Sequence, residues 1–146
     1  MFNSKHINKL RFFASVGLIA ALSACSDSGP VFDPDVPPQN VQVVSGDSDS
    51  NDVHNTISWA FDPTTTSYVV YVSDTPGVDD SSAQVVPSAA GLNYVTHSGL
   101  DVDSGIEVVS GMPLYYRVQA VSGSQVSVLS IEVTGTPEQS TSQHNL

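Results

Sequence analysis

The sequence predicts an all-β domain built as a sandwich of short antiparallel strands. Short runs rich in Val, Ile, Tyr, Thr and Trp recur at nearly even spacing after residue 38. Clusters of Gly, Pro, Asp, Ser and Thr separate these runs, and no stretch after residue 25 sustains a helical period of apolar residues. Evenly spaced short strands with turn residues between them are typical of a β-sandwich.

Six runs are predicted as strands because β-branched and aromatic residues dominate them. The gaps between them hold turn-forming sequences such as GDSDSND and DTPGVDDSS. One folded domain is therefore expected over residues 39–136. Its predicted strands cover 39–45, 55–60, 68–73, 92–97, 114–121 and 125–134.

Alternation within these strands predicts the core, because successive side chains of a strand point to opposite faces of the sheet. In the run 114–121 one face is apolar, and the other carries Tyr115, Arg117 and Gln119. The same alternation gives an apolar face to two earlier runs. The predicted core residues are Ile57, Trp59, Tyr68, Val70, Val72, Leu114, Tyr116, Val118 and Ala120.

The order of several short motifs resembles a fibronectin type III domain. The motifs are TISW at 56–59, YVVY at 68–71, GL at 99–100, YYRVQAV at 115–121 and EVTGTP at 132–137. TPGV at 75–78 and HSGL at 97–100 are similar to turns of bacterial members of that family. The resemblance covers about residues 37–137 and implies an immunoglobulin-like antiparallel sandwich of about seven strands. Two features depart from it: Leu114 stands where the family usually has a tyrosine, and the connection 101–112 is longer than usual.

The first 24 residues have the layout of a cleaved secretory signal peptide. Lys5, Lys9 and Arg11 precede an apolar stretch without charges that runs from Phe12 to Leu22. A basic segment followed by a short apolar segment is typical of such signals. The stretch is shorter than the roughly 20 residues with which a helix spans a bilayer, so a permanent transmembrane helix is not expected.

The tetrapeptide Leu22-Ser23-Ala24-Cys25 resembles the lipobox of bacterial lipoproteins. In that family the cysteine thiol is diacylated, and the signal peptidase cuts directly before it. The resemblance therefore implies that Cys25 is the lipidation site. Because Cys25 is the only cysteine of the chain, disulfides are not expected to contribute to stability. The resemblance implies a bacterial cell-envelope protein whose partner is the membrane. Ser26, directly after the cysteine, resembles the sorting signal of lipoproteins in the outer membrane.

The segments that flank the domain are predicted to be flexible. Residues 25–38 are rich in Pro, Asp, Ser and Gly and are interpreted as a lipidated tether. Proline-rich chain extends by about 3.1 Å per residue, so this tether is expected to hold the domain about 30 to 40 Å from the membrane. Residues 137–146 are polar and are predicted to be a disordered tail.

The charge balance excludes nucleic acid as a partner. All 15 acidic residues follow Cys25, whereas Arg117 is the only Lys or Arg after it. One cation against 15 acids leaves the mature chain with a formal charge of −14. Nucleic-acid binding depends on cationic side chains that neutralise phosphates, and this chain lacks them.

No motif points to an enzyme, a cofactor or a metal site. The four histidines, His6, His54, His97 and His144, are far apart in the sequence. The acidic run 47–52 fails the EF-hand pattern, because Asp52 and Ser58 occupy the positions of its glycine and its bidentate glutamate. A less regular calcium site between loops stays an alternative. A second acidic group, Asp101, Asp103 and Glu107, is interpreted as a loop kept soluble by charge.

The predicted binding surface lies on the outward face of the runs 68–73 and 114–121. Tyr71, Tyr115 and Arg117 are expected there, and aromatic side chains beside an arginine are typical of a contact surface for a protein or a glycan. The sequence thus predicts a structural or adhesive interaction module. The alternatives are a carbohydrate-binding accessory module and a subunit of an envelope or secretion assembly that pairs through an edge strand.

Overall fold

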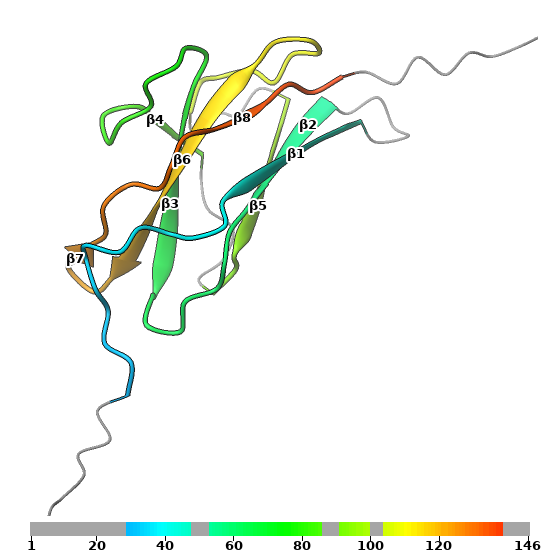
Figure 1. The fold of residues 1–146 in the computed structure, drawn as a ribbon. Coiled ribbons are helices and arrows are strands. Elements are labelled where there is room, and N and C mark those ends of the chain that lie inside the picture. Colours follow the sequence, from blue (N-terminus) through cyan, green and yellow to red (C-terminus); the bar gives the residue numbers. More distant parts are fainter. Residues whose placement is uncertain (1–28, 48–52, 86–90, 100–103, 139–146) are drawn as a thin grey trace, which may run out of the picture.

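The computed structural model describes residues 29–47, 53–85, 91–99 and 104–138, which form two antiparallel sheets (Figure 1). These residues contain strands and connections but no helix, so none of them belongs to a helix that would cross a membrane. The strands are β1 (Gln42–Asp47), β2 (Val53–Ser58), β3 (Ser67–Ser73), β4 (Ala83–Val85), β5 (Tyr94–Ser98), β6 (Leu114–Ser122), β7 (Gln125–Val126) and β8 (Val133–Gly135).

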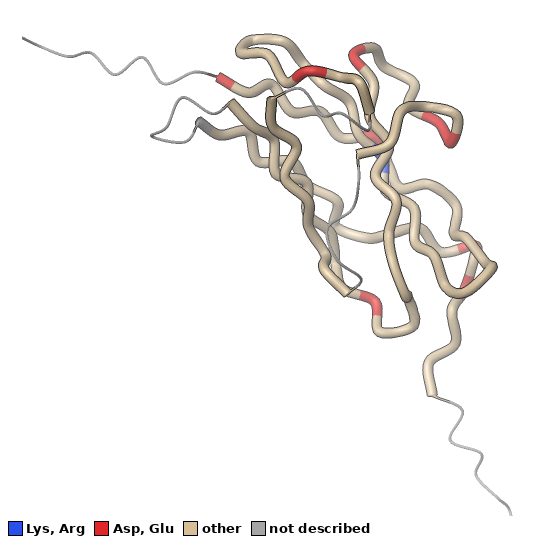
Figure 2. Tube along the Cα trace, turned by 180° about the vertical axis from the view of Figure 1, so that it is seen from behind, with Lys and Arg blue, Asp and Glu red and all other residues tan. Residues whose placement is uncertain are grey.

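The strand pairing confirms the predicted all-β, immunoglobulin-like sandwich. One sheet has the order β1-β2-β5, and the other has the order β4-β3-β6-β7 with β8 also paired to β6. The longest pairing joins β3 to β6, from Ser67 opposite Val121 to Ser73 opposite Tyr115. Most of the acidic residues that the structure describes lie outside the strands (Figure 2).

The core forms between the two sheets from the residues that the alternation predicts. Ile57, Val70, Val118 and Tyr116 have no exposed surface, and the other predicted core side chains are also buried. Burial of one such aliphatic side chain stabilises a fold by about 1.5–3 kcal/mol. Both sheets contribute to a single cluster, so the described residues share one core.

A polar network lies inside this core and joins the two sheets. Asn55 of β2 donates from Nδ2 to the hydroxyl oxygen of Tyr116 on β6, at 3.0 Å. The Tyr116 hydroxyl also lies 3.0 Å from Nδ1 of His97 on β5, whose Nε2 lies 3.2 Å from the carbonyl oxygen of Ile106. Because the Tyr116 oxygen accepts from Asn55, its own hydrogen is left for Nδ1 of His97. His97 then donates from Nε2–H to Ile106.

The network also explains a glycine in β8. The carbonyl oxygen of Gly135 accepts a hydrogen bond from Nδ2 of Asn55 at 3.5 Å. A Cβ atom at position 135 would lie only 2.6 Å from Oδ1 of Asn55, so no larger residue fits there without a shift. That same Oδ1 accepts a hydrogen bond from the Ser45 hydroxyl at 2.7 Å. Strand β8 therefore approaches the edge of the other sheet closely.

The run 125–134 is not one strand, as the sequence predicts, but two short strands separated by residues 127–132. In this connection Ser127 and Ser130 place their hydroxyls against β6. They accept hydrogen bonds from the backbone N–H groups of Ala120 and Val118, at 3.0 and 2.9 Å. The two hydroxyls thus replace backbone carbonyls that a regular strand would supply. Because buried N–H groups require a partner, these serines preserve the sheet where pairing is interrupted.

The folded unit extends beyond the predicted domain at both ends. Phe32 packs against the core, and the carbonyl of Pro34 accepts a hydrogen bond from the Val128 N–H at 2.8 Å, so part of the predicted tether belongs to the domain. At the other end Pro137 is buried, and its carbonyl accepts from the N–H of Gly111 at 2.7 Å. Strand β4 was not predicted, because three residues are too few to show a period.

We expect Tyr116→Phe to lower the free energy of unfolding by about 1–3 kcal/mol, because it leaves buried polar groups of Asn55 and His97 without the hydroxyl. The measurement is urea unfolding followed by circular dichroism. Tyr115→Phe on the same strand is the matched control, since Tyr115 is half-buried, and its change is expected to stay within about 0.5 kcal/mol. Equal stability of the two variants would contradict the role assigned to the network.

Candidate binding surfaces

The outward face of β3 and β6 brings the predicted surface residues together. Tyr71 lies directly opposite Arg117 in the strand pairing, and Tyr115 lies opposite Ser73. Tyr115 and Arg117 are half-buried. Nε of Arg117 is buried and has no hydrogen-bond partner among the described residues. The outward face of β3 and β6 therefore does bring Tyr71, Tyr115 and Arg117 close together.

Tyr71 differs from the exposed placement that the sequence predicts. It is only 5 % exposed, and its hydroxyl donates to Oε1 of Gln119 at 2.9 Å. Nε2 of Gln119 in turn donates to the carbonyl oxygen of Ser127 at 2.7 Å. Burial raises the pKa of the Tyr71 phenol, and the negative charge of Asp80 raises it further. The ring of Tyr71 is thus part of a small packed layer rather than an open contact.

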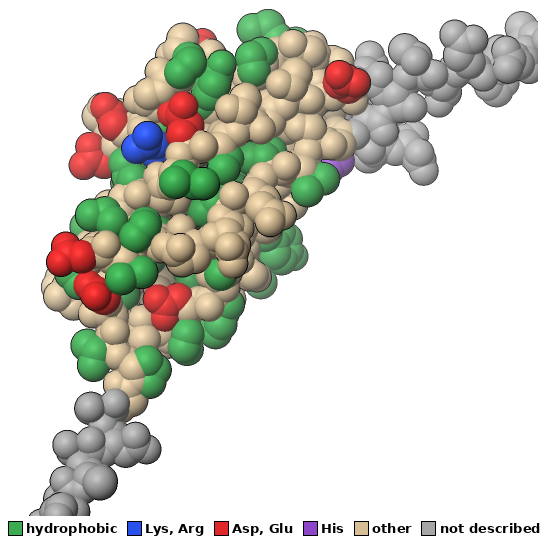
Figure 3. All heavy atoms as spheres, viewed as in Figure 1, with side chains coloured by type: hydrophobic (Ala, Val, Ile, Leu, Met, Phe, Trp, Pro, Cys, Tyr) green, Lys and Arg blue, Asp and Glu red, His purple; other side chains and the backbone are tan. Residues whose placement is uncertain are grey.

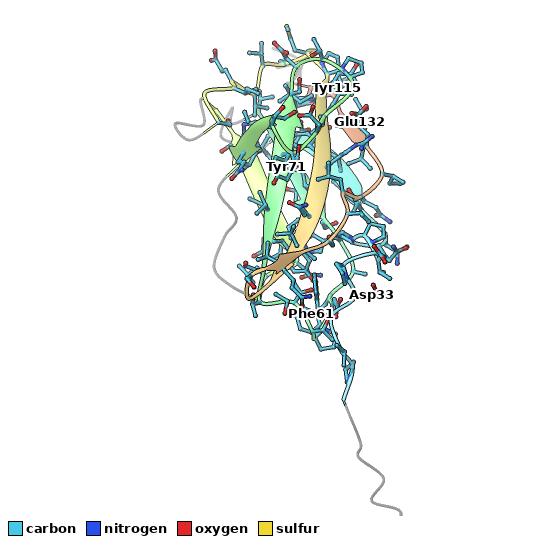
Figure 4. All side chains as sticks on the ribbon, turned by 90° about the vertical axis from the view of Figure 1, so that its left-hand side faces the viewer. Asp33, Phe61, Tyr71, Tyr115 and Glu132 are labelled. Atoms are coloured by element: carbon cyan, nitrogen blue, oxygen red, sulfur yellow. The ribbon has the colours of Figure 1, made fainter. Side chains whose placement is uncertain are left out.

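The connection between β3 and β4 runs near this layer, since the charge of its Asp80 acts on the Tyr71 phenol, and Glu132 holds the connection in place. Oε2 of Glu132 accepts hydrogen bonds from the backbone N–H groups of Gly77 and Val78, both at 2.8 Å. Gly77 has a φ of 98°, a conformation that favours glycine. Val78 is buried at 2 % exposure. Figure 4 shows Glu132, Tyr71 and Tyr115 on this side of the domain.

A second surface feature, not predicted from the sequence, lies at the end of the domain where the described chain begins. We call this end the N-terminal pole, defined by residues 31–38 and 60–63. It contains a pocket of about 230 Å³ that is lined by Val36, Phe61 and Tyr68 among others. Val36 is 49 % exposed and Phe61 is 60 % exposed. The signal in the sequence was the presence of large apolar residues in turn segments, where polar residues are usual.

Asp62 shapes the loop of this pole. Its carboxylate accepts hydrogen bonds from the backbone N–H and the hydroxyl of Thr64, at 2.8 and 2.7 Å. These hydrogen bonds hold the pKa of Asp62 below its usual value. Its own N–H donates to the Tyr68 hydroxyl at 3.1 Å. Asp62, which follows Phe61, thus fixes the loop through hydrogen bonds of both its backbone N–H and its carboxylate.

The remaining candidate residues are not gathered into a site by the part of the chain that the structure describes. Within that part, no three His, Cys, Asp or Glu side chains lie close enough to hold a metal ion. His97 is buried in the polar network, His54 is half-buried in β2, and Glu107 is exposed. Other candidates lie outside the described residues: Cys25, His6, His144, Asp101, Asp103 and residues 48–52 of the first acidic run.

These features define a β-sandwich domain with immunoglobulin-like strand pairing. No protein-family model and no curated protein matches the sequence. Three solved structures are similar to it in fold. A myokine has 16 % identity and a TM-score of 0.46, covering 72 % of this chain and 99 % of its own. A fibronectin III-like protein from Clostridium thermocellum has 20 % identity and a TM-score of 0.46, covering 74 % and 99 %. The third fibronectin III domain of a human protein has 18 % identity and a TM-score of 0.48, covering 77 % and 94 %.

Replacing Glu132 with alanine is expected to release the β3–β4 connection, because two backbone N–H groups lose a charged acceptor. We expect a loss of about 1–2 kcal/mol in the free energy of unfolding and faster amide exchange at Gly77 and Val78. Hydrogen exchange followed by NMR measures both effects. Glu138→Ala removes an exposed carboxylate and serves as the control. Unchanged exchange at both amides in Glu132→Ala would contradict the clamp.

Proposed function

We propose that the protein is a lipid-anchored lipoprotein of the bacterial cell envelope whose fibronectin type III-like domain acts as a structural or protein-interaction module. The observation that carries the proposal is Leu22-Ser23-Ala24-Cys25 directly after a basic segment and an uncharged apolar stretch. Cysteine suits this role because its thiolate is a strong nucleophile for acylation. Two or more acyl chains on Cys25 give stable anchoring, since each buried methylene contributes about 0.8 kcal/mol. Ser26, directly after the cysteine, supports localisation in the outer membrane.

The geometry of the domain supports this proposal in one respect. The described chain begins at the N-terminal pole, and the core begins at Phe32. A lipid on Cys25 would therefore leave both sheets and the opposite pole accessible to other molecules. A disulfide-free sandwich held by one core suits a module that presents a surface. Nucleic acid remains an unsuitable partner because Arg117 is the only Lys or Arg after Cys25.

Protein contact is the partner class that the structure favours over a glycan. A glycan platform on the face of β3 and β6 would require exposed aromatic rings, and Tyr71 is only 5 % exposed, with its hydroxyl bonded to Gln119. Exposed aliphatic side chains are present instead on the segment between β7 and β8, where Val128 is 48 % and Ile131 is 72 % exposed. Exposed apolar side chains of this kind suit contact with a protein better than contact with a glycan.

Cys25→Ala is expected to abolish membrane association, because it removes the nucleophile that accepts the lipid. In the native host, the wild-type protein should partition with detergent and show an intact mass of a chain that begins at an acylated Cys25. The alanine variant should lose both properties. Ser26→Ala is the control and should keep the anchor. A wild-type protein with an uncleaved leader or a bare thiol would refute the proposal.

A further inference from the structure

The N-terminal pole exposes apolar side chains where the chain approaches the predicted lipid. Val31 is 79 % exposed, Val36 is 49 % exposed, and Phe61 is 60 % exposed. Val36 and Phe61 line the same pocket. Figure 4 shows Phe61 and Asp33 at this same end, and Figure 3 shows hydrophobic side chains around the point where the described chain begins. Single exposed apolar residues are ordinary, but a cluster of them marks a contact surface.

The length of the linking chain decides what this surface meets. Because Phe32 packs against the core, only residues 26–31 separate Cys25 from the folded unit. Fully extended chain covers at most 3.3–3.6 Å per residue, so the reach from Cys25 to Phe32 is at most about 25 Å. This reach is shorter than the tether predicted from the sequence. A lipid on Cys25 would therefore keep the N-terminal pole within about 25 Å of the membrane.

We infer that the N-terminal pole rests on the surface of a zwitterionic phospholipid bilayer as a second membrane contact. This inference rests on the proposed acylation of Cys25. Phe61, Val36 and Val31 enter the headgroup region, where apolar side chains of peripheral proteins are stabilised. The contact fixes the orientation of the domain, so the connection between β3 and β4 and the opposite pole face away from the bilayer.

Charge selects the kind of lipid. The pole carries Asp33, Asp35 and Asp62 and contains no Lys or Arg. An anionic surface would repel these carboxylates, because the field of anionic headgroups attracts only basic segments. Ammonium groups of phosphatidylethanolamine complement them instead. Phosphatidylethanolamine is therefore the headgroup that this pole fits.

The test compares hydrogen exchange in the mature chain on vesicles and in solution. Cys25 is the only cysteine, so a purified chain beginning there can be coupled to a maleimide lipid in vesicles of phosphatidylethanolamine and phosphatidylcholine. Coupling should slow deuterium uptake in residues 33–37 and 60–64 at least about threefold. Uptake in the connection 74–82 should stay unchanged. Equal uptake in both segments on vesicles and in solution would overturn the inference.

Two comparisons sharpen the result. The double variant Val36→Ser and Phe61→Ser should exchange on vesicles as it does in solution, whereas Val44→Ser, which changes a side chain 63 % exposed on β1, should keep the protection. Replacing half of the lipid with phosphatidylglycerol should restore the deuterium uptake of the wild-type chain to its value in solution. Protection that survives the double variant, or that grows with phosphatidylglycerol, would overturn the inference.

This design separates the two proposals. Chemical coupling supplies the anchor whether or not the native host acylates Cys25. If the coupled chain shows no slowing of exchange but the native protein is acylated, only the pole contact is refuted. A native protein with a bare thiol refutes the lipoprotein proposal, whatever the coupled chain shows.

Discussion

The hydrogen bonds among Asn55, His97 and Tyr116 determine how the two sheets face each other. Apolar contacts between the sheets are non-directional and tolerate sliding, whereas a buried polar group without a partner costs about 1–3 kcal/mol. Asn55 and His97 are directly opposite each other in β2 and β5, and Tyr116 reaches both from β6. Burial raises the pKa of the Tyr116 phenol, so it stays a neutral donor. A shift of β6 by one residue would bury Arg117 in place of Tyr116.

Side chains, rather than further strands, complete the second sheet. Ser127 and Ser130 satisfy N–H groups on the edge of β6 away from β3, between its pairings with β7 and β8. Glu132 ties the β3–β4 connection to the segment before β8. On the outward face of β3 and β6, Tyr71 is only 5 % exposed. At the N-terminal pole Phe61 is 60 % exposed, although Asp62 and Tyr68 hold its loop in place. The two surfaces therefore differ, because the aromatic side chain is buried at one and exposed at the other.

The core was predictable from the sequence because it depends on local alternation, and β6 shows this with Tyr116 and Val118 inside and Arg117 outside. Tyr71 shows the limit of that reasoning. Alternation places it on the outward face correctly, but it is buried there, and its hydroxyl bonds to Gln119, 48 residues later in the sequence. Phe32 is similar: nothing in a segment rich in Pro and Asp indicates that one aromatic side chain reaches the core. The burial of both Tyr71 and Phe32 depends on residues far away in the sequence, which local patterns do not reveal.

The central claim is that the polar network couples the two sheets. A double-mutant cycle with Asn55→Ala and Tyr116→Phe measures this coupling directly, because each substitution removes one partner from a different sheet. The account predicts an interaction energy of about 1 kcal/mol or more between the two positions, within the range found for residues in contact. Strictly additive losses of stability would contradict it, because they would mean that Asn55 and Tyr116 do not depend on each other.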